Sequence, residues 1–291
     1  MGHWLQILVL GLLLGGVYAM MASGLTLLFG VMRVVNLAHA AFILIASYLT
    51  YALFEGLALD PMISLLVTMP LMFGLGVGLY LLLFPRIEDS PRYVEMTVLL
   101  TFGLALIVEG LLTFTFTGIF RSVRPEYAAT SVTIGEIFLP TSQLYASLIS
   151  FALLVLLWVM LRFTKTGTAI RATMQNRAAA QIVGVNVRRI SALSFGLGMS
   201  LAGAAGSLLS FMFPFFPARH WQWIALLLAL IVLGGMGSIK GAVIGALLLA
   251  VASAFVTDVI GPTWSPITFY LTLFLILLIR PQGLFGVKVR L

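Results

Sequence analysis

The chain contains no cysteine and few charged residues: of its 291 residues only 9% are charged, while 62% are hydrophobic. The absence of cysteine excludes disulfides, thiol catalysis and cysteine-ligated metal sites. Soluble domains carry roughly 25% charged residues, so the low charge excludes an ordinary soluble fold. Because the apolar runs are long and do not alternate, we predict an all-α protein that crosses a membrane many times.

The groups that usually carry catalysis are also scarce. The chain has three histidines and nine acidic residues, and its sequence contains no evident Ser–His–Asp set, paired carboxylates or metal-ligand cluster. The glycine-rich run 234–241 includes Lys240, but no Ser or Thr follows that lysine as it does in a phosphate-binding loop. We therefore expect no enzyme activity and no metal or cofactor in this chain.

Apolar runs long enough to cross a bilayer, which takes about 20 residues, define the predicted spans. They cover residues 5–30, 36–54, 62–84, 96–119, 142–162, 190–213, 222–239, 241–258 and 266–280. Only the glycine-rich run separates the seventh from the eighth, so residues 222–258 form either two spans or two half-helices that enter from one side. The prediction is eight or nine spans, and the first is retained because it is too long for a cleaved signal peptide.

The basic residues predict the orientation of the spans. If the N-terminus is outside, three basic residues lie outside, namely Arg121, Arg124 and Arg219. The other thirteen then lie inside: Arg33, Arg86, Arg92, Arg162, Lys165, Arg171, Arg177, Arg188, Arg189, Lys240, Arg280, Lys288 and Arg290. Cytoplasmic loops carry the excess of basic residues, so we expect a cytoplasmic C-terminus in the plasma (inner) membrane and an N-terminus outside. The pI of about 10.1 reflects this topology, and we expect no nucleic-acid partner.

Two connections are too long to be simple turns. Residues 120–141 lie outside in this topology and predict a short surface element. Residues 163–189 lie inside and contain no acidic residue. A helix that starts at Thr166 or Thr168 and stops at Gly184 would carry an apolar stripe at i, i+4, i+8 and i+12, formed by Ile170, Met174, Ala178 and Ile182.

This basic amphipathic helix has two interpretations. It could lie on anionic lipid headgroups, or it could dock into a groove on a cytoplasmic partner. Its apolar stripe has no Trp or Phe, which membrane-surface helices usually carry, and Asn186 could cap the span that follows.

Several motifs carry a family resemblance. The order Ala179-Ala180, three residues, then Gly184 resembles the coupling motif of ATP-binding-cassette (ABC) importer permeases. Gly24–Gly30 followed by Asn36–His39, the run 171–195, Leu233–Gly241 and Pro281–Gly286 resemble, in order and spacing, branched-chain amino acid permeases of the LivH type. Two departures are Ala178, where the coupling motif usually has Glu, and Ala40, where the family commonly has Gly.

The resemblance implies one transmembrane permease domain over residues 1–291, with a coupling segment at 163–189. It implies a second homologous permease subunit, two cytoplasmic ATPase subunits that hold ATP-Mg, and a periplasmic or extracellular substrate-binding protein. The residues expected to meet the ATPase are Arg171, Met174, Arg177, Ala178, Ala179, Ala180, Ile182 and Gly184. The expected function is import of apolar amino acids or related small organic solutes.

Six residues are candidates for the translocation pathway or its gate: Asn36, His39, Glu109, Gly234, Gly235 and Gly237. Asn36 and His39 share one helical face and are expected to have a structural or gating role rather than to contact substrate. Glu109 lies within a span, where a carboxylate must be paired, hydrated or protonated, and we expect it to hold a polar contact inside the subunit. The glycines are expected to allow close helix packing, with a broken helix lining the pathway as the alternative.

Other functions make different demands on the sequence. A proton-coupled secondary transporter would act without ATPases and would depend on Glu109 or His39. A membrane-embedded enzyme would need clustered nucleophiles, acids or metal ligands in its spans, which are scarce here. A purely structural anchor would not need glycine-rich spans interrupted by polar residues.

Overall fold

The computed structural model describes residues 2–88 and 90–286. Within them, nine helices are long and apolar enough to cross a membrane. They are α1 (Gly2–Met32), α2 (His39–Leu57), α3 (Pro61–Leu83), α4 (Tyr93–Phe116), α5 (Thr141–Phe163), α8 (Val187–Met212), α9 (His220–Gly234), α10 (Ile239–Val259) and α11 (Ser265–Ile279). Each predicted span falls on one of these helices, which confirms the prediction of a polytopic all-α protein.

The remaining elements are short and join the spans. Two helices follow α5, namely α6 (Lys165–Gln175) and α7 (Arg177–Ile182), and four short 3₁₀ turns are η1 (Phe84–Arg86), η2 (Glu126–Ala129), η3 (Pro217–Arg219) and η4 (Pro262–Trp264). The predicted surface element in 120–141 consists of η2 and an antiparallel hairpin, β1 (Ser131–Ile134) and β2 (Ile137–Pro140). Its register pairs Ser131 with Pro140 and Ile134 with Ile137.

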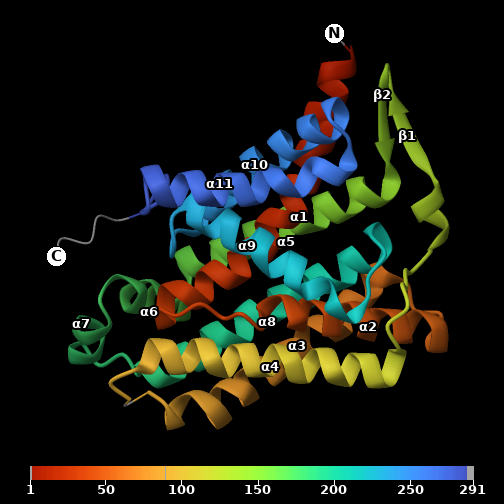
Figure 1. Cartoon of the computed structure of the whole chain (residues 1–291). Coiled ribbons are helices and arrows are strands. Elements are labelled where there is room, and N and C mark those ends of the chain that lie inside the picture. The colour runs from red at the N-terminus through yellow and green to blue at the C-terminus, as the bar shows by residue number, and fades with distance from the viewer. Residues whose placement is uncertain (1, 89, 287–291) are drawn as a thin grey trace.

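The β1–β2 hairpin lies at one end of the bundle, and α7 lies at the other end (Figure 1). At the hairpin end, Gln6 of α1 exchanges hydrogen bonds with the backbone of Phe138, at 2.5 and 2.7 Å. At the opposite end, here called the α7 end, the Arg33 guanidinium after α1 donates to the Met174 carbonyl oxygen of α6 at 2.7 Å. The nine helices of the described residues therefore place the start of α1 and the end of α11 at opposite ends.

The run 222–258 forms two complete spans, α9 and α10, rather than two half-helices. Gly237, which precedes α10, lies against Gly30 at the α7 end, and Asp258 near the end of α10 is 2.9 Å from His3 at the hairpin end. The chain reverses between α9 and α10 with Gly235 at φ +96° and Gly237 at φ +86°, a region that glycine occupies without steric cost. Residues 2–88 and 90–286 therefore contain nine spans rather than eight.

Helix α8 occupies the centre of the bundle, and nearly all of its side chains are buried. Its glycines let backbones approach closely: a Cβ on Gly206 would overlap the Ile43 carbonyl of α2, and one on Gly203 would lie 3.0 Å from the Thr68 carbonyl of α3. On the other side, a Cβ on Gly198 would lie 2.9 Å from the Gly24 carbonyl of α1. Van der Waals contact at such small residues is a main source of helix association in membranes.

A hydroxyl cluster holds α2, α3 and α8 together in this core. The Ser207 hydroxyl lies 2.8 Å from both the Thr50 and the Thr68 hydroxyls, and Ser47 donates to the Gly206 carbonyl at 2.9 Å. All of these side chains are fully buried. Hydrogen bonds between helices in lipid contribute on the order of 1 kcal/mol each. Because they are directional, the cluster favours one arrangement of α2, α3 and α8 in addition to the close packing.

Candidate functional site

Helix α6 is fixed to the bundle at the α7 end. Thr164 caps it, with its hydroxyl accepting from the Gly167 amide at 2.9 Å, and Gly167 packs on the backbone of Leu161 in α5. Ile170 is fully buried, and the Met174 side chain packs on Gly30 of α1. The helix therefore follows the last turn of α5 and contacts α1.

The predicted continuous helix with one apolar stripe is wrong, because the chain breaks at Asn176 (φ −152°, ψ 107°). The Asn176 side-chain oxygen accepts from the Ala179 amide at 3.0 Å and caps α7 as a new helix. Asparagine competes with helical hydrogen bonding through such local bonds, which is why it favours caps over helix interiors. The start is also Thr164 rather than Thr166 or Thr168.

Helix α7 projects from its end of the bundle (Figure 1). Apolar side chains at the end of this helix are exposed. Ile182 is 85% exposed and Val183 is 76% exposed. Gly184 at φ +86° ends the helix as predicted: its amide donates to the Gln181 carbonyl at 3.0 Å, and the Val185 amide donates to the Ala180 carbonyl at 2.9 Å. This is the Schellman arrangement, which favours glycine because a Cβ would be strained there.

The eight residues predicted to meet the ATPase are divided between the two helices. Arg171 is exposed and Met174 half-buried on α6. On α7 and its stop, Ala178, Ala179, Ile182 and Gly184 are exposed, Arg177 is half-buried and Ala180 is buried. Arg177 forms an ion pair with Glu88, which follows η1. The pair connects the start of α7 to the turn after α3. In the loop that follows α7, Asn186 caps the start of α8.

Asn36 and His39 are buried in the core at the start of α2. The Asn36 side-chain oxygen accepts from the Ala38 amide at 3.1 Å, and the His39 ring lies where a Cβ on Gly24 of α1 would meet it at 3.2 Å. Neither His39 ring nitrogen has a hydrogen-bond partner among the described residues. The Thr101 hydroxyl accepts from the Leu37 amide at 3.2 Å and connects this turn to α4.

Two of the three candidate glycines, Gly234 and Gly235, lie in tight backbone contacts, whereas Gly237 has only ordinary contact distance to Gly30. Gly234 packs on Gly241 across the turn between α9 and α10, and Gly235 packs on Gly286. The segment after α11 is held there by backbone bonds from Leu284 to the Leu233 carbonyl and from Phe285 to the Gly234 carbonyl, at 2.8 and 3.2 Å. Close packing therefore accounts for the positions of Gly234 and Gly235.

Glu109 of α4 contacts residues of α9 that sequence reasoning did not select. The Trp221 indole N–H donates to the Glu109 Oε2 atom at 3.0 Å, and the His220 Nε2 atom lies 3.8 Å from the same oxygen. His220 is fully buried. These residues are more than 100 positions from Glu109, so no local pattern joins them, and the structure does not bring Glu109 together with Asn36 or His39.

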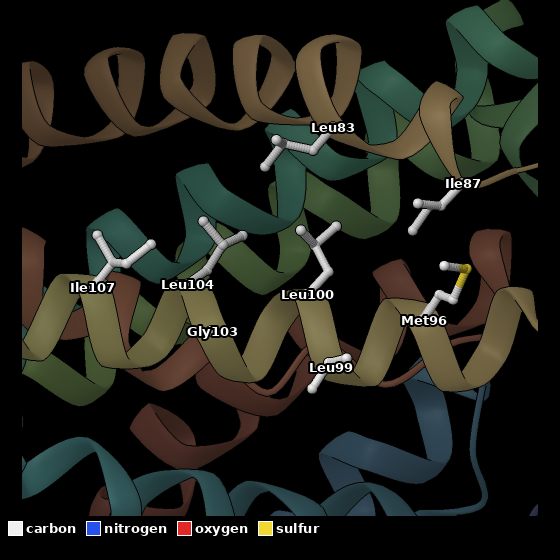
Figure 2. A pocket seen from close by; sticks show the side chains of 8 residues that line it. All are labelled: Leu83, Ile87, Met96, Leu99, Leu100, Gly103, Leu104 and Ile107. Atoms are coloured by element: carbon white, nitrogen blue, oxygen red, sulfur yellow. The ribbon is translucent and has the colours of Figure 1, made fainter.

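Two cavities open on the surface, and neither contains a predicted site residue. One of about 430 Å³ lies between the end of α3 and residues 96–107 of α4 and is lined only by apolar residues: Leu83, Ile87, Met96, Leu99, Leu100, Gly103, Leu104 and Ile107 (Figure 2). The other, of about 530 Å³, lies at the hairpin end between residues 122–129 and 211–214. The apolar lining of the first suits contact with hydrocarbon.

Comparison with known proteins gives consistent matches over nearly the whole chain. The family model described as "Branched-chain amino acid transport system / permease component" matches residues 7–279. The permease protein BraD of Pseudomonas aeruginosa is 26% identical over 298 residues, which cover 98% of this chain and 96% of BraD. LivH of Escherichia coli K12 is 26% identical with the same coverage, and a probable LivH of Methanocaldococcus jannaschii is 28% identical, covering 92% and 88%.

Two further matches are weaker or shorter. E. coli LivM, described as a permease protein of a branched-chain amino acid transport system, is 30% identical over 146 residues, which cover 48% of this chain and 34% of LivM. Among solved structures, PsaBC from Streptococcus pneumoniae in complex with Fab aligns over 96% of this chain and 93% of that chain, with 16% identity and a TM-score of 0.47. None of these matches is described as a proton-coupled carrier.

The sequence motifs that resemble LivH-type permeases and the family match over residues 7–279 point to the same family. The described residues contain nine spanning helices and an exposed helix between the fifth and sixth spans, and the family match, which includes both, is to a transport permease component. The chain belongs to the family of branched-chain amino acid transport system permease components.

Proposed function

We propose that this chain is a permease subunit of an ABC importer that moves branched-chain amino acids into the cell. In this assignment residues 1–291 form one transmembrane domain, and two ATPase subunits hydrolyse ATP-Mg on the cytoplasmic side. A second, related permease completes the pathway, which the partial similarity to LivM supports. A periplasmic or extracellular binding protein delivers the solute.

The α7 end is assigned to the cytoplasm of the plasma (inner) membrane. The described basic residues of the inside set fall at that end, whereas Arg121, Arg124 and Arg219 fall at the hairpin end; Lys288 and Arg290 lie outside the described residues. Because basic residues accumulate on the cytoplasmic side, the start of α1 is assigned outside and the end of the chain inside.

The single observation that carries the proposal is the exposure of α7. Ile182 is the last residue of a six-residue helix that projects beyond the ends of the spans, and Val183 directly follows it, so water would surround both side chains in an isolated subunit. Apolar side chains at helix positions that a groove can accept are typical of helix-in-groove recognition. The short helix offers too little apolar surface to lie stably among lipid headgroups, which favours a protein partner.

The connections of α7 suit it to transmit motion. It begins two residues after the end of α6, which packs on α5 and α1, and it is followed after four residues by α8 at the centre of the bundle. The Arg177–Glu88 ion pair adds a connection to the end of α3. Displacement of α7 by a partner would therefore move the core helix rather than a flexible loop.

The test is reconstitution of the chain with its partner subunits in liposomes, with uptake of labelled leucine as the readout. Ile182→Asp should lower ATP-dependent uptake by at least about tenfold and abolish co-purification of the ATPases, because it places a charge in the docking groove. Ile134→Asp, at an exposed isoleucine of the hairpin, is the matched control and should retain the ATPases. Normal ATPase binding by Ile182→Asp would contradict docking through α7, and uptake by the chain alone without ATP would contradict the ABC assignment.

A further inference from the structure

Glu109 has an unusual position among the acidic residues of the spanning helices. In the described part of the chain Glu55, Glu95 and Asp258 lie within one turn of a helix end, whereas Glu109 lies seven residues before the end of α4. At 1.5 Å per residue this is about 10 Å below the hairpin end. A carboxylate at such depth is costly in hydrocarbon and is retained mainly where it has a function.

The carboxylate is only partly satisfied by the protein. Among the described residues its one hydrogen bond comes from the Trp221 indole N–H to Oε2, and the Glu109 side chain is 26% exposed. A carboxylate can accept about four hydrogen bonds, so Oε1 and the second lone pair of Oε2 remain available to a ligand. The exposed side of this residue therefore faces a hydrated pathway or a partner subunit rather than lipid.

The His220 ring supplies a second hydrogen-bond acceptor, which is directed at the Glu109 carboxylate. Its Nδ1 atom lies 2.9 Å from the Pro217 carbonyl oxygen, which can only accept, so Nδ1 carries the proton. In the neutral ring Nε2 is then an acceptor, and it is fully buried with no hydrogen-bond partner among the described residues. It faces Glu109 Oε2 at 3.8 Å, and a buried acceptor left without a donor costs about 1–3 kcal/mol.

Aromatic rings form the wall beside these two acceptors. The Trp221 ring lies 4.4 Å from the His220 ring and 5.5 Å from the Phe102 ring, measured between ring centres. Phe102 lies seven residues, about two helical turns, before Glu109 and so on the same side of α4. The faces of such rings attract cations.

We propose that Glu109, His220 and the rings of Trp221 and Phe102 bind the ammonium group of the transported amino acid in the outer half of the membrane. An ammonium group has three N–H donors: one bonds to the Glu109 carboxylate, one to the His220 Nε2 lone pair, and the aromatic faces stabilise the charge. The inference rests on the proposed import function. It narrows the solute to one with a primary ammonium group and excludes uncharged amides and urea as preferred cargo.

The test uses the assembled transporter in vesicles with saturating leucine-loaded binding protein. Glu109→Gln keeps an acceptor for the Trp221 N–H but removes the charge, so leucine uptake should fall at least tenfold while ATPase co-purification and the melting temperature stay unchanged. Glu109→Asp, which restores the carboxylate, should recover part of the uptake. Glu95→Gln, at an exposed acid in the first turn of the same helix, should transport like the unaltered chain.

A second measurement separates recognition from packing. In the unaltered transporter, 3-methylbutylammonium should inhibit leucine uptake and 4-methylpentanamide should not, even if a Glu109 variant proves unstable.

The outcomes distinguish this site from the function on which it rests. Normal leucine uptake by Glu109→Gln, or equal inhibition by the amine and the amide, would overturn the ammonium site and leave the importer assignment in place. Failure of the unaltered transporter to take up any branched-chain amino acid with ATP would overturn both.

Discussion

Helices α8 and α7 are both rich in small residues, glycine and alanine in α8 and alanine in α7, yet α8 is enclosed in the bundle and α7 projects from it. In α8, residues such as Gly198 and Gly206 bring neighbouring backbones within contact distance. In α7, Ala178 and Ala179 are exposed. Small side chains therefore allow another backbone to approach closely in both helices. In α8 the approaching backbones belong to helices of the same chain, whereas in α7 the exposed alanines leave this surface open to another protein.

The difference follows from length and anchoring. Helix α8 has 26 residues and is surrounded by α1, α2, α3 and α5, whereas α7 has six residues between its Asn176 cap and its Gly184 stop. A six-residue helix gains little stability alone, so α7 depends on its caps and on the contacts of α6. Changes in α8 should therefore affect folding, and changes in α7 should affect the proposed partner contact.

The largest effect is expected from Gly206→Val in α8. Its side chain would overlap the Ile43 carbonyl and the Ser47 amide of α2, which are backbone atoms and cannot move aside. Overpacking of this kind typically costs about 1–3 kcal/mol, and more where backbone is displaced. Size-exclusion profiles and melting curves in mild detergent should show loss of folded protein. Gly74→Val, at a glycine of α3 with open space around it, is the control.

The next largest effect is expected from Gly184→Asp at the end of α7, and it should be functional rather than structural. The position has φ +86° and is exposed, so a short polar side chain is tolerated at modest cost, but its charge would lie at the proposed ATPase contact. ATP-dependent uptake should fall at least about tenfold while membrane insertion persists. Gly184→Asn has the same shape without the charge and should retain most uptake; equal loss in both variants would point to strain instead.

A smaller effect is expected from Ser207→Ala in the core of α8. The substitution removes the group that bonds to both Thr50 and Thr68, and hydrogen bonds between membrane helices average about 0.6 kcal/mol and reach about 1.7 kcal/mol. A lower melting temperature with unchanged span number should result. If Thr50→Ala combined with Ser207→Ala destabilises no more than the single change, the two hydroxyls act as one unit; strict additivity would contradict the cluster.

The smallest effect is expected from Arg177→Gln at the start of α7. Its ion pair with Glu88 is partly exposed, with side chains 35% and 27% accessible, and such pairs contribute about 0–1 kcal/mol. The melting temperature should hardly change, and uptake should fall only a few-fold if the pair helps to position α7. Arg188→Gln, at an exposed arginine in the first turn of α8, provides the comparison, and a larger stability loss in Arg177→Gln would show that the pair is part of the fold.

The sequence predicted the spans because hydrophobic length is a local property. All nine apolar runs correspond to helices, and Gly184 and Asn186 act as the predicted helix stop and cap. The break at Asn176 was missed although its cap is also local, since the apolar repeat across 170–182 favoured one helix. The hairpin at 131–140 was expected only as an unspecified surface element, because short exposed strands carry little hydrophobic pattern.

The sequence by itself determined that this protein is a membrane-spanning bundle and predicted which chain segments share a side, because hydropathy and basic charge act on each segment independently of its neighbours. It left eight or nine spans open, and the structure of 222–258 decided for nine within the described residues. The tertiary structure alone decided that α8 is the core, that α7 stands apart from α6, and that Glu109 meets Trp221 and His220. These contacts join residues far apart in the chain, and they depend on which helix faces lie close enough to exclude lipid.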